Sequence, residues 1–297
     1  MPGCWMCDVY GITALFAVVS FVLGTCIGSF LNVCIYRIPR EMPVYRPSRS
    51  FCPECKHEIA WHHNIPLLSY LLLRGKCAYC GKRFTARYFL VEALVGLLFL
   101  LVFLKYGTGA CGAPLGLVVM TDPRLIPVYW LAMSGLVLGT FVDFEHLIIP
   151  DRVTLGGIAA GLVLSPLVPA MHRQVTWHGA LIESVIGAAL GWGILWALGF
   201  VGKLIFKKEA MGFGDVKLVG AIGAFLGWRA VLFCLLLSSF FGAIVGLSLV
   251  LLGRKEMGSK IPYGPYLALA AALWILWGWH VWGAYIGMMM PNTRGAG

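Results

Sequence analysis

The chain has 297 residues, of which 60% are hydrophobic and only 12% are charged. Ordinary soluble domains carry roughly 25% charged residues, so this composition excludes a soluble globular protein and predicts a membrane protein. The net charge of +10 is expected to reflect topology and contact with anionic membrane lipid, and no nucleic-acid partner is expected.

Apolar stretches recur along the chain at the length of membrane spans. A transmembrane helix needs about 20 apolar residues to cross the hydrocarbon layer. Eight stretches come close to this length, near residues 12–36, 88–105, 126–142, 153–170, 180–202, 216–234, 235–252 and 263–287. Only Gly227–Ala230 separates the sixth from the seventh, where we expect a tight turn at Trp228-Arg229. The sequence predicts an all-α polytopic membrane protein of about eight transmembrane helices.

The basic residues predict the orientation, because short cytoplasmic loops carry an excess of Lys and Arg. With the N-terminus outside, four cytoplasmic loops hold 18 of the 23 Lys and Arg residues; these loops are 37–87, 143–152, 203–217 and 254–260. We therefore expect three parts. These are an outer N-terminus with the first transmembrane helix at 1–36, a cytoplasmic cysteine loop at 37–87 and a transmembrane domain at 88–297.

The loop at 37–87 contains two CxxC motifs, Cys52–Cys55 and Cys77–Cys80, separated by 21 residues. Paired motifs of this kind are typical of structural zinc sites with four thiolates, and a reducing cytosol disfavours disulfides. We expect a structural zinc, with a redox or disulfide role as the alternative. The expected ligands are Cys52, Cys55, Cys77 and Cys80. A disulfide stays open for the outer cysteines Cys4, Cys7 and Cys111.

Two aspartates stand at the ends of apolar runs. Asp143 follows the third expected span, and Asp215 precedes the sixth. Ionisable residues at membrane depth are functional candidates because their burial is costly, and the predicted topology puts both at cytoplasmic helix ends. Two close carboxylates can share one proton, so that one acts as base toward water while the other polarises a scissile carbonyl. We predict a catalytic dyad of Asp143 and Asp215, the alternative being that each caps a helix or meets a neighbouring Lys.

Four neighbours are predicted to support these aspartates. Gly212 and Gly214 lack Cβ, which would let a peptide substrate approach the carboxylate closely. Lys217 either biases the aspartates electrostatically or is an interfacial lysine reaching the headgroups. Asp151 follows Pro150 and is expected to cap the fourth span.

Several motifs together resemble those of type IV prepilin peptidases, over nearly the whole chain. In chain order they are Gly28–Val33, Tyr36–Pro39, the two CxxC motifs, Asn64–Tyr70, Arg74–Cys77, Arg87-Tyr88, Asp143–Asp151 and Gly212–Lys217. The combination is specific, whereas presenilin-like intramembrane proteases share the Gly-x-Gly-Asp motif alone. One departure is Phe89, where the family typically has proline.

The resemblance implies a bifunctional enzyme of the bacterial inner membrane. Asp143 and Asp215 would be the catalytic aspartates of an aspartic endopeptidase that removes the basic leader of prepilins or pseudopilins, after a glycine at the cytoplasmic face. Such enzymes then methylate the new N-terminal residue with S-adenosylmethionine, in type IV pilus and type II secretion systems. No glycine-rich nucleotide loop is visible, so the S-adenosylmethionine site stays unassigned.

Two other classes of function are weighed against this one. A general intramembrane aspartyl protease without methyltransferase activity would share the dyad but has no need of the cysteine loop. A proton-coupled transporter would place its carboxylates near the bilayer midplane and often contains inverted repeats. The two aspartates lie instead at helix ends, and no such repeat is visible. The sequence therefore favours the prepilin peptidase.

Overall fold

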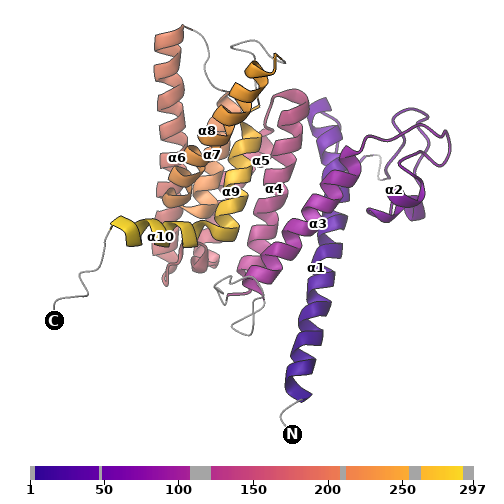
Figure 1. Ribbon diagram of the computed structural model, residues 1–297, viewed down its shortest axis with the longest axis horizontal. Coiled ribbons are helices and arrows are strands. Elements are labelled where there is room, and N and C mark those ends of the chain that lie inside the picture. Colours follow the sequence, from indigo (N-terminus) through magenta and orange to yellow (C-terminus); the bar gives the residue numbers. More distant parts are fainter. Residues whose placement is uncertain (1–3, 47–48, 108–121, 208–211, 254–261, 290–297) are drawn as a thin grey trace. The chain divides into compact units, whose positions relative to one another are not determined.

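The computed structural model describes residues 4–46, 49–107, 122–207, 212–253 and 262–289. In these ranges the protein is built of helices, and its β structure is limited to two isolated bridges in the cysteine loop. The chain forms two compact units, Met1–His146 and Leu147–Gly297 (Figure 1). The all-α class expected from the sequence is confirmed.

The first unit contains three long helices and the cysteine loop. The long helices are α1 (Cys4–Arg37), α3 (Arg87–Tyr106) and α4 (Leu125–His146). The loop between α1 and α3 contains two 3-10 turns and one short helix. These are Ile38–Arg40, Trp61–His63 and α2 (Leu68–Leu72). The loop is therefore held between the end of α1 and the start of α3.

Helices α1 and α3 approach each other closely, because glycines lie at their crossing. A Cβ on Gly24 would lie 2.8 Å from the Cα of Gly96, and one on Gly28 would lie 2.7 Å from the Cα of Glu92. Small residues four positions apart let membrane helices pack backbone against backbone. The crossing brings the first turns of α3 beside the last third of α1.

The second unit consists of the remaining helices. They are α5 (Asp151–Leu167), a 3-10 turn (Pro169–His172), α6 (Trp177–Phe206), α7 (Phe213–Leu226), α8 (Trp228–Leu251), α9 (Gly264–Leu273) and α10 (Trp279–Met289). A π-helical turn at Trp274–Gly278 joins α9 to α10, and Figure 1 shows α10 running across the direction of α9. Such turns are a known cause of sharp helix kinks.

Helix α7 is enclosed by α5 and α6. All residues from Leu218 to Leu226 are buried. A Cβ on Gly187 of α6 would lie 2.2 Å from the backbone oxygen of Gly223, and one on Gly161 of α5 would lie 2.7 Å from the Cβ of Ala224. A helix that is apolar on every side is a buried helix, which explains the hydrophobicity of this short segment.

The expected count of eight spans is not confirmed. Among the described residues, six helices are long and apolar enough to cross a membrane; they are Thr13–Arg40, Arg87–Tyr106, Leu125–His146, Trp177–Ile205, Trp228–Leu251 and Gly264–Met289. The two helices that fall short are α5, with 17 residues, and α7, with 14.

The boundary between the sixth and seventh expected spans was also placed wrongly. Helix α7 ends at Leu226, eight residues before the expected end of the sixth span at 234. Gly227 alone forms the turn, with a φ of +81°, and Trp228 already begins α8. Glycine adopts positive φ at little cost, so the turn lies at Gly227 and not at Trp228-Arg229.

Candidate functional site

Asp143 lies near the end of α4, with a buried side chain. Two residues later, Glu145 forms an ion pair with Arg87, the first residue of α3. The Arg87 side chain is largely shielded from solvent, whereas that of Glu145 is more exposed. The ion pair therefore ties the end of α4, which carries Asp143, to the start of α3.

Asp215 lies in the first turn of α7, whose N-cap is Gly212. The backbone N–H of Asp215 donates a 3.1 Å hydrogen bond to the carbonyl oxygen of Gly212. The carboxylate turns back over this helix end, since Asp215 Oδ2 would lie 3.2 Å from a Cβ placed on Gly212. A helix N-terminus stabilises negative charge through its dipole and its free N–H groups.

The two predicted glycines lie against different neighbours. A Cβ on Gly212 would face the Asp215 carboxylate, whereas a Cβ on Gly214 would lie 3.3 Å from the Cβ of Ile149. Gly214 thus lets the first turn of α7 lie close to the segment that precedes α5. Gly212 keeps the space beside the carboxylate clear.

Lys217 and Asp151 form an ion pair with each other. Lys217 Nζ donates a 2.6 Å hydrogen bond to Asp151 Oδ1 and lies 5.0 Å from the centre of the Phe213 ring. Pro150 occupies the N-cap of α5, and Asp151 is its first helical residue. The pair therefore joins the beginning of α7 to the beginning of α5.

The two predicted catalytic aspartates belong to different units. Asp143 belongs to Met1–His146 and Asp215 to Leu147–Gly297. The dyad stays a prediction. The disulfide left open for Cys4, Cys7 and Cys111 falls outside the described side chains.

The four cysteines of the loop gather into one cluster. Their Sγ atoms all lie within 4.8 Å of one another, and Cys52 Sγ is 3.9 Å from Cys80 Sγ. Four sulfurs at about 2.3 Å from a tetrahedral metal ion would be about 3.8 Å apart. The cluster of Cys52, Cys55, Cys77 and Cys80 could therefore hold a metal ion.

The two CxxC motifs share one backbone conformation, which we call the knuckle. The first cysteine of each motif donates a hydrogen bond, from Cys52 to the His57 oxygen and from Cys77 to the Lys82 oxygen. The residue after each motif has positive φ, 60° at Lys56 and 70° at Gly81. Each donates its N–H back to the oxygen of the first cysteine, at 2.9 and 3.0 Å. The knuckles bring four thiols together from two distant segments.

The cysteines differ in acidity. Burial raises the pKa of the Cys77 thiol, but hydrogen bonds from the backbone of Cys80 and Tyr79 outweigh it and lower the pKa to about 7. The backbone of Lys82 lowers the pKa of Cys80, yet burial and the neighbouring thiols raise it to about 11. A metal ion must displace the protons that remain, so its binding depends on pH.

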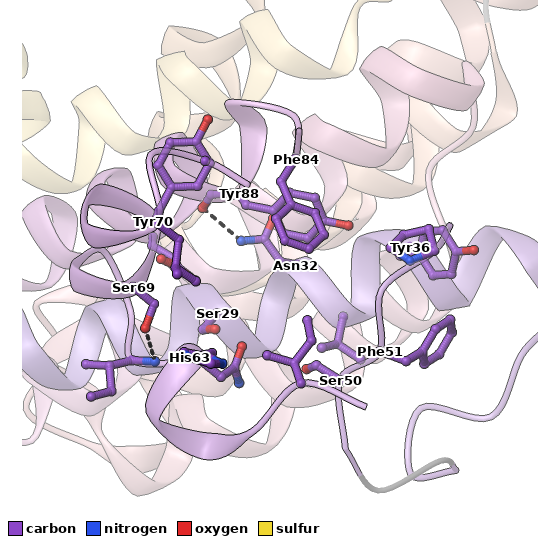
Figure 2. Close-up of a pocket in the computed structure, with 18 of the residues that line it drawn as sticks. Ser29, Asn32, Tyr36, Ser50, Phe51, His63, Ser69, Tyr70, Phe84 and Tyr88 are labelled. Carbon is purple, nitrogen blue, oxygen red and sulfur yellow. Dashed lines mark hydrogen bonds between the residues drawn. The ribbon is translucent and has the colours of Figure 1, made fainter. Parts of the chain in front are cut away.

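A pocket of about 900 Å³, part of it open to solvent, lies among α1, the cysteine loop and α3. Figure 2 shows its aromatic and polar walls, with the amide of Asn32 directed at the backbone of Tyr88. Glu92 of α3 also lines it and is buried. We did not assign this pocket from the sequence, although Asn32 and Glu92 are polar residues within apolar helices, which is itself a functional signal.

The chain matches two family models. Residues 22–106 match the bacterial Peptidase A24 N-terminal domain, and residues 130–247 match the type IV leader peptidase family. The first range contains the cysteine cluster and the pocket, and the second contains Asp143 and Asp215.

Several curated relatives carry the name prepilin leader peptidase/N-methyltransferase. The one from Myxococcus xanthus is 43% identical over 247 residues, which is 83% of this chain and 66% of that protein. The one from Aeromonas hydrophila is 37% identical over 292 residues, covering 91% of this chain and 93% of that protein. The one from Pseudomonas aeruginosa is 34% identical over 294 residues, covering 91% and 93%.

No solved structure matches the chain. The family matches and the relatives together extend over both units, the cysteine cluster and both aspartate motifs. The chain therefore belongs to the type IV leader peptidase family, as an aspartic peptidase that passes several times through the bacterial inner membrane.

Proposed function

We propose that this protein removes the basic leader from type IV prepilins or pseudopilins and then N-methylates the new N-terminal residue. The observation that carries the proposal is the similarity to prepilin leader peptidase/N-methyltransferases over 91% of the chain. The match covers the cysteine-bearing N-terminal domain as well as the peptidase region. The second activity is supported by this N-terminal domain, which a general intramembrane aspartyl protease does not need.

Cleavage is proposed to follow a two-aspartate mechanism at the cytoplasmic face, after a glycine, with the N-terminus outside. We assign the base role to Asp215, because its place at the start of α7 favours negative charge. It takes a proton from a water, whose oxygen attacks the scissile carbonyl carbon. Asp143 gives its proton to the carbonyl oxygen. Collapse of the adduct breaks the C–N bond, and the leaving amine takes up a proton.

The remaining predicted residues have supporting roles in this scheme. Gly212 keeps the Asp215 carboxylate accessible. The Lys217–Asp151 pair and Gly214 position the first turns of α7. The peptidase domain is proposed to comprise residues 88–297, after the outer N-terminus with the first helix at 1–36 and the cytoplasmic loop at 37–87.

The cysteine cluster is proposed to hold a structural zinc. Four thiolates fill the coordination shell of zinc, which leaves no open position for a substrate, and the sulfur spacing fits such a site. The zinc would therefore stabilise the loop and take no part in the chemistry. S-adenosylmethionine would supply the methyl group that replaces a proton on the new N-terminal amine.

A single assay tests the proposal. Purified enzyme in detergent is given S-adenosylmethionine and a peptide with a Lys-rich leader, a glycine, a phenylalanine and an apolar helix, and the products are weighed by mass spectrometry. We expect loss of the leader and a gain of one CH₂ on the mature product. Leader loss without that gain would leave a peptidase and refute the methyltransferase. Absence of cleavage, with wild type and Asp215→Asn indistinguishable, would refute prepilin cleavage and favour a general intramembrane aspartyl protease or a transporter.

A further inference from the structure

Glu92 is a buried carboxylate whose partners are all neutral. Its side chain is 8% exposed and lies one and a half turns into α3. Its Oε2 accepts a 2.8 Å hydrogen bond from the backbone N–H of Leu67, and its other partner is the Ser29 hydroxyl. Within the described ranges no Lys or Arg forms an ion pair with it. A buried carboxylate without a cation is costly, so this position suits a cationic group of a ligand.

The backbone segment that donates a hydrogen bond to Glu92 has an unusual conformation. Leu67 has a φ of 60° and a ψ of −50°, a backbone conformation that leucine rarely adopts. Its N–H is the donor to Glu92. Local strain of this kind persists where the surrounding structure enforces it, often at ligand sites.

Two further polar atoms on the pocket wall lack partners among the described residues. Asn32 is 2% exposed; its Nδ2 donates a 3.0 Å hydrogen bond to the Tyr88 oxygen, but its Oδ1 accepts none. The Nδ1 atom of His63 is likewise buried and unpaired. Buried polar atoms nearly always have a hydrogen-bond partner. Polar groups of a bound molecule would supply the missing ones.

Aromatic side chains make up much of the remaining wall (Figure 2). They come from α1, the loop, α2 and α3, and are Tyr36, Phe51, Tyr70, Phe84 and Tyr88. Aromatic faces stack on nucleobases and attract cations. The space between these walls amounts to about 900 Å³, part of which is open solvent, so a bound molecule could enter from outside.

We propose that this pocket binds S-adenosylmethionine, with the Glu92 carboxylate offsetting the positive charge of the sulfonium and the aromatic wall holding the adenine. The inference rests on the proposed N-methylation and names the site that this activity would use. Loop residues Phe51 and Lys76, which line the pocket, directly precede Cys52 and Cys77. The cysteine cluster therefore also positions one wall of the pocket.

The test compares two ligands that differ in charge. S-adenosylmethionine carries a sulfonium, whereas S-adenosylhomocysteine has lost the methyl group and the charge. Dissociation constants of both are measured by calorimetry on the full-length enzyme in detergent, for the wild type, Glu92→Gln and the exposed control Glu58→Gln. We expect Glu92→Gln to weaken the binding of S-adenosylmethionine at least about tenfold and to leave the affinity for S-adenosylhomocysteine unchanged. Glu58→Gln should alter neither affinity.

An equal effect on both ligands, or no effect, would overturn the assignment of Glu92. A wild type that methylates, but whose ligand affinities are unaltered by Glu92→Gln, would refute the pocket and leave the proposed function standing. A wild type that neither binds S-adenosylmethionine nor methylates would refute the proposed methylation. The leader-cleavage rate of each variant reports whether it is folded. If Glu92→Gln does not fold, Phe84→Leu tests the pocket instead. This variant should bind both ligands about tenfold more weakly, and unchanged binding would overturn the proposal.

Discussion

Lys217 Nζ donates a 2.6 Å hydrogen bond to Asp151 Oδ1 and so connects the beginnings of α7 and α5. Asp215 stands two residues before Lys217, in the part of α7 that this pair holds. The Asp151 side chain is 62% exposed, whereas that of Lys217 is 16% exposed. The pair is thus a positioning contact close to solvent.

Replacing Asp151 should therefore have a small effect. Exposed ion pairs contribute about 0–1 kcal/mol to stability, so Asp151→Asn should lower the free energy of unfolding by less than about 1 kcal/mol. We expect leader cleavage to slow by only several-fold. Melting curves and cleavage rates in detergent measure the two effects. A loss as complete as that of Asp215→Asn would show that Asp151 takes part in the chemistry.

Asp143→Asn and Asp215→Asn should each abolish cleavage and leave the protein inserted and folded. Asparagine keeps the shape of the side chain but can neither accept nor donate the required proton, so we expect kcat to fall at least about a thousandfold. Asp122→Asn is the matched control, because Asp122 pairs with Arg124 before α4. Normal processing by either catalytic variant would rule out the dyad.

The double variant Cys52→Ser, Cys55→Ser should lose its bound metal. It removes one knuckle and half of the sulfur ligands. Elemental analysis of purified protein should find one zinc per chain in the wild type and none in the variant. Cys26→Ser, in the middle of α1, should keep the full amount. Unchanged zinc in the double variant would refute the tetrathiolate site.

Gly187→Ala should destabilise the second unit strongly. The new Cβ would lie 2.2 Å from the Gly223 oxygen, so α6 and α7 would have to separate. Overpacking of this kind typically costs about 1–3 kcal/mol or more. Gly193→Ala on the same helix has open space at its Cβ and should not lower the melting temperature. Equal melting temperatures for both variants would contradict the close crossing of α6 and α7.

His172 should make stability depend on pH. Burial lowers its pKa to about 4, against a smaller opposite effect from the backbone of Ala224, whereas a free histidine titrates near about 6.5. Below that pH the unfolded chain binds a proton that the folded chain does not. Stability should therefore fall between about pH 6.5 and 4, by about 3 kcal/mol in total.

Melting temperatures across this pH range, compared with those of His172→Gln, check the prediction. The variant should show a flatter profile, whereas the exposed His280→Gln should keep the wild-type slope. Parallel profiles for wild type and His172→Gln would show that the pKa of His172 is the same in the folded and the unfolded protein.

The sequence predicted the class of fold correctly, whereas its count of eight spans is not confirmed. Hydropathy reports how apolar a segment is, and it cannot tell contact with lipid from contact with protein. Residues Leu218–Leu226 are apolar and packed against α5 and α6, and their helix, with 14 residues, is shorter than the span expected at 216–234. The turn lies at Gly227, a residue type that tolerates positive φ, but only the structure shows that its φ is positive.

The candidate sites were predictable to different degrees. The spacing of the CxxC motifs predicted a cluster of four cysteines, and the structure brings their sulfurs together. The matching turn at Lys56 was not predictable, since lysine has no preference for positive φ. The pocket was missed because Asn32, Phe84 and Glu92 come from three separate segments that only the fold brings together.

The burial of α7 also affects how the enzyme responds to its membrane. A change in bilayer thickness tilts helices that face the lipid, and it reaches α7 through the helices packed around it, chiefly α5 and α6. The turn that carries Asp215 would therefore keep its orientation relative to these neighbours, whereas a pilin substrate embedded in the bilayer would tilt freely. We expect the depth at which the substrate is immersed, rather than any adjustment within the enzyme, to select the peptide bond that is presented for cleavage.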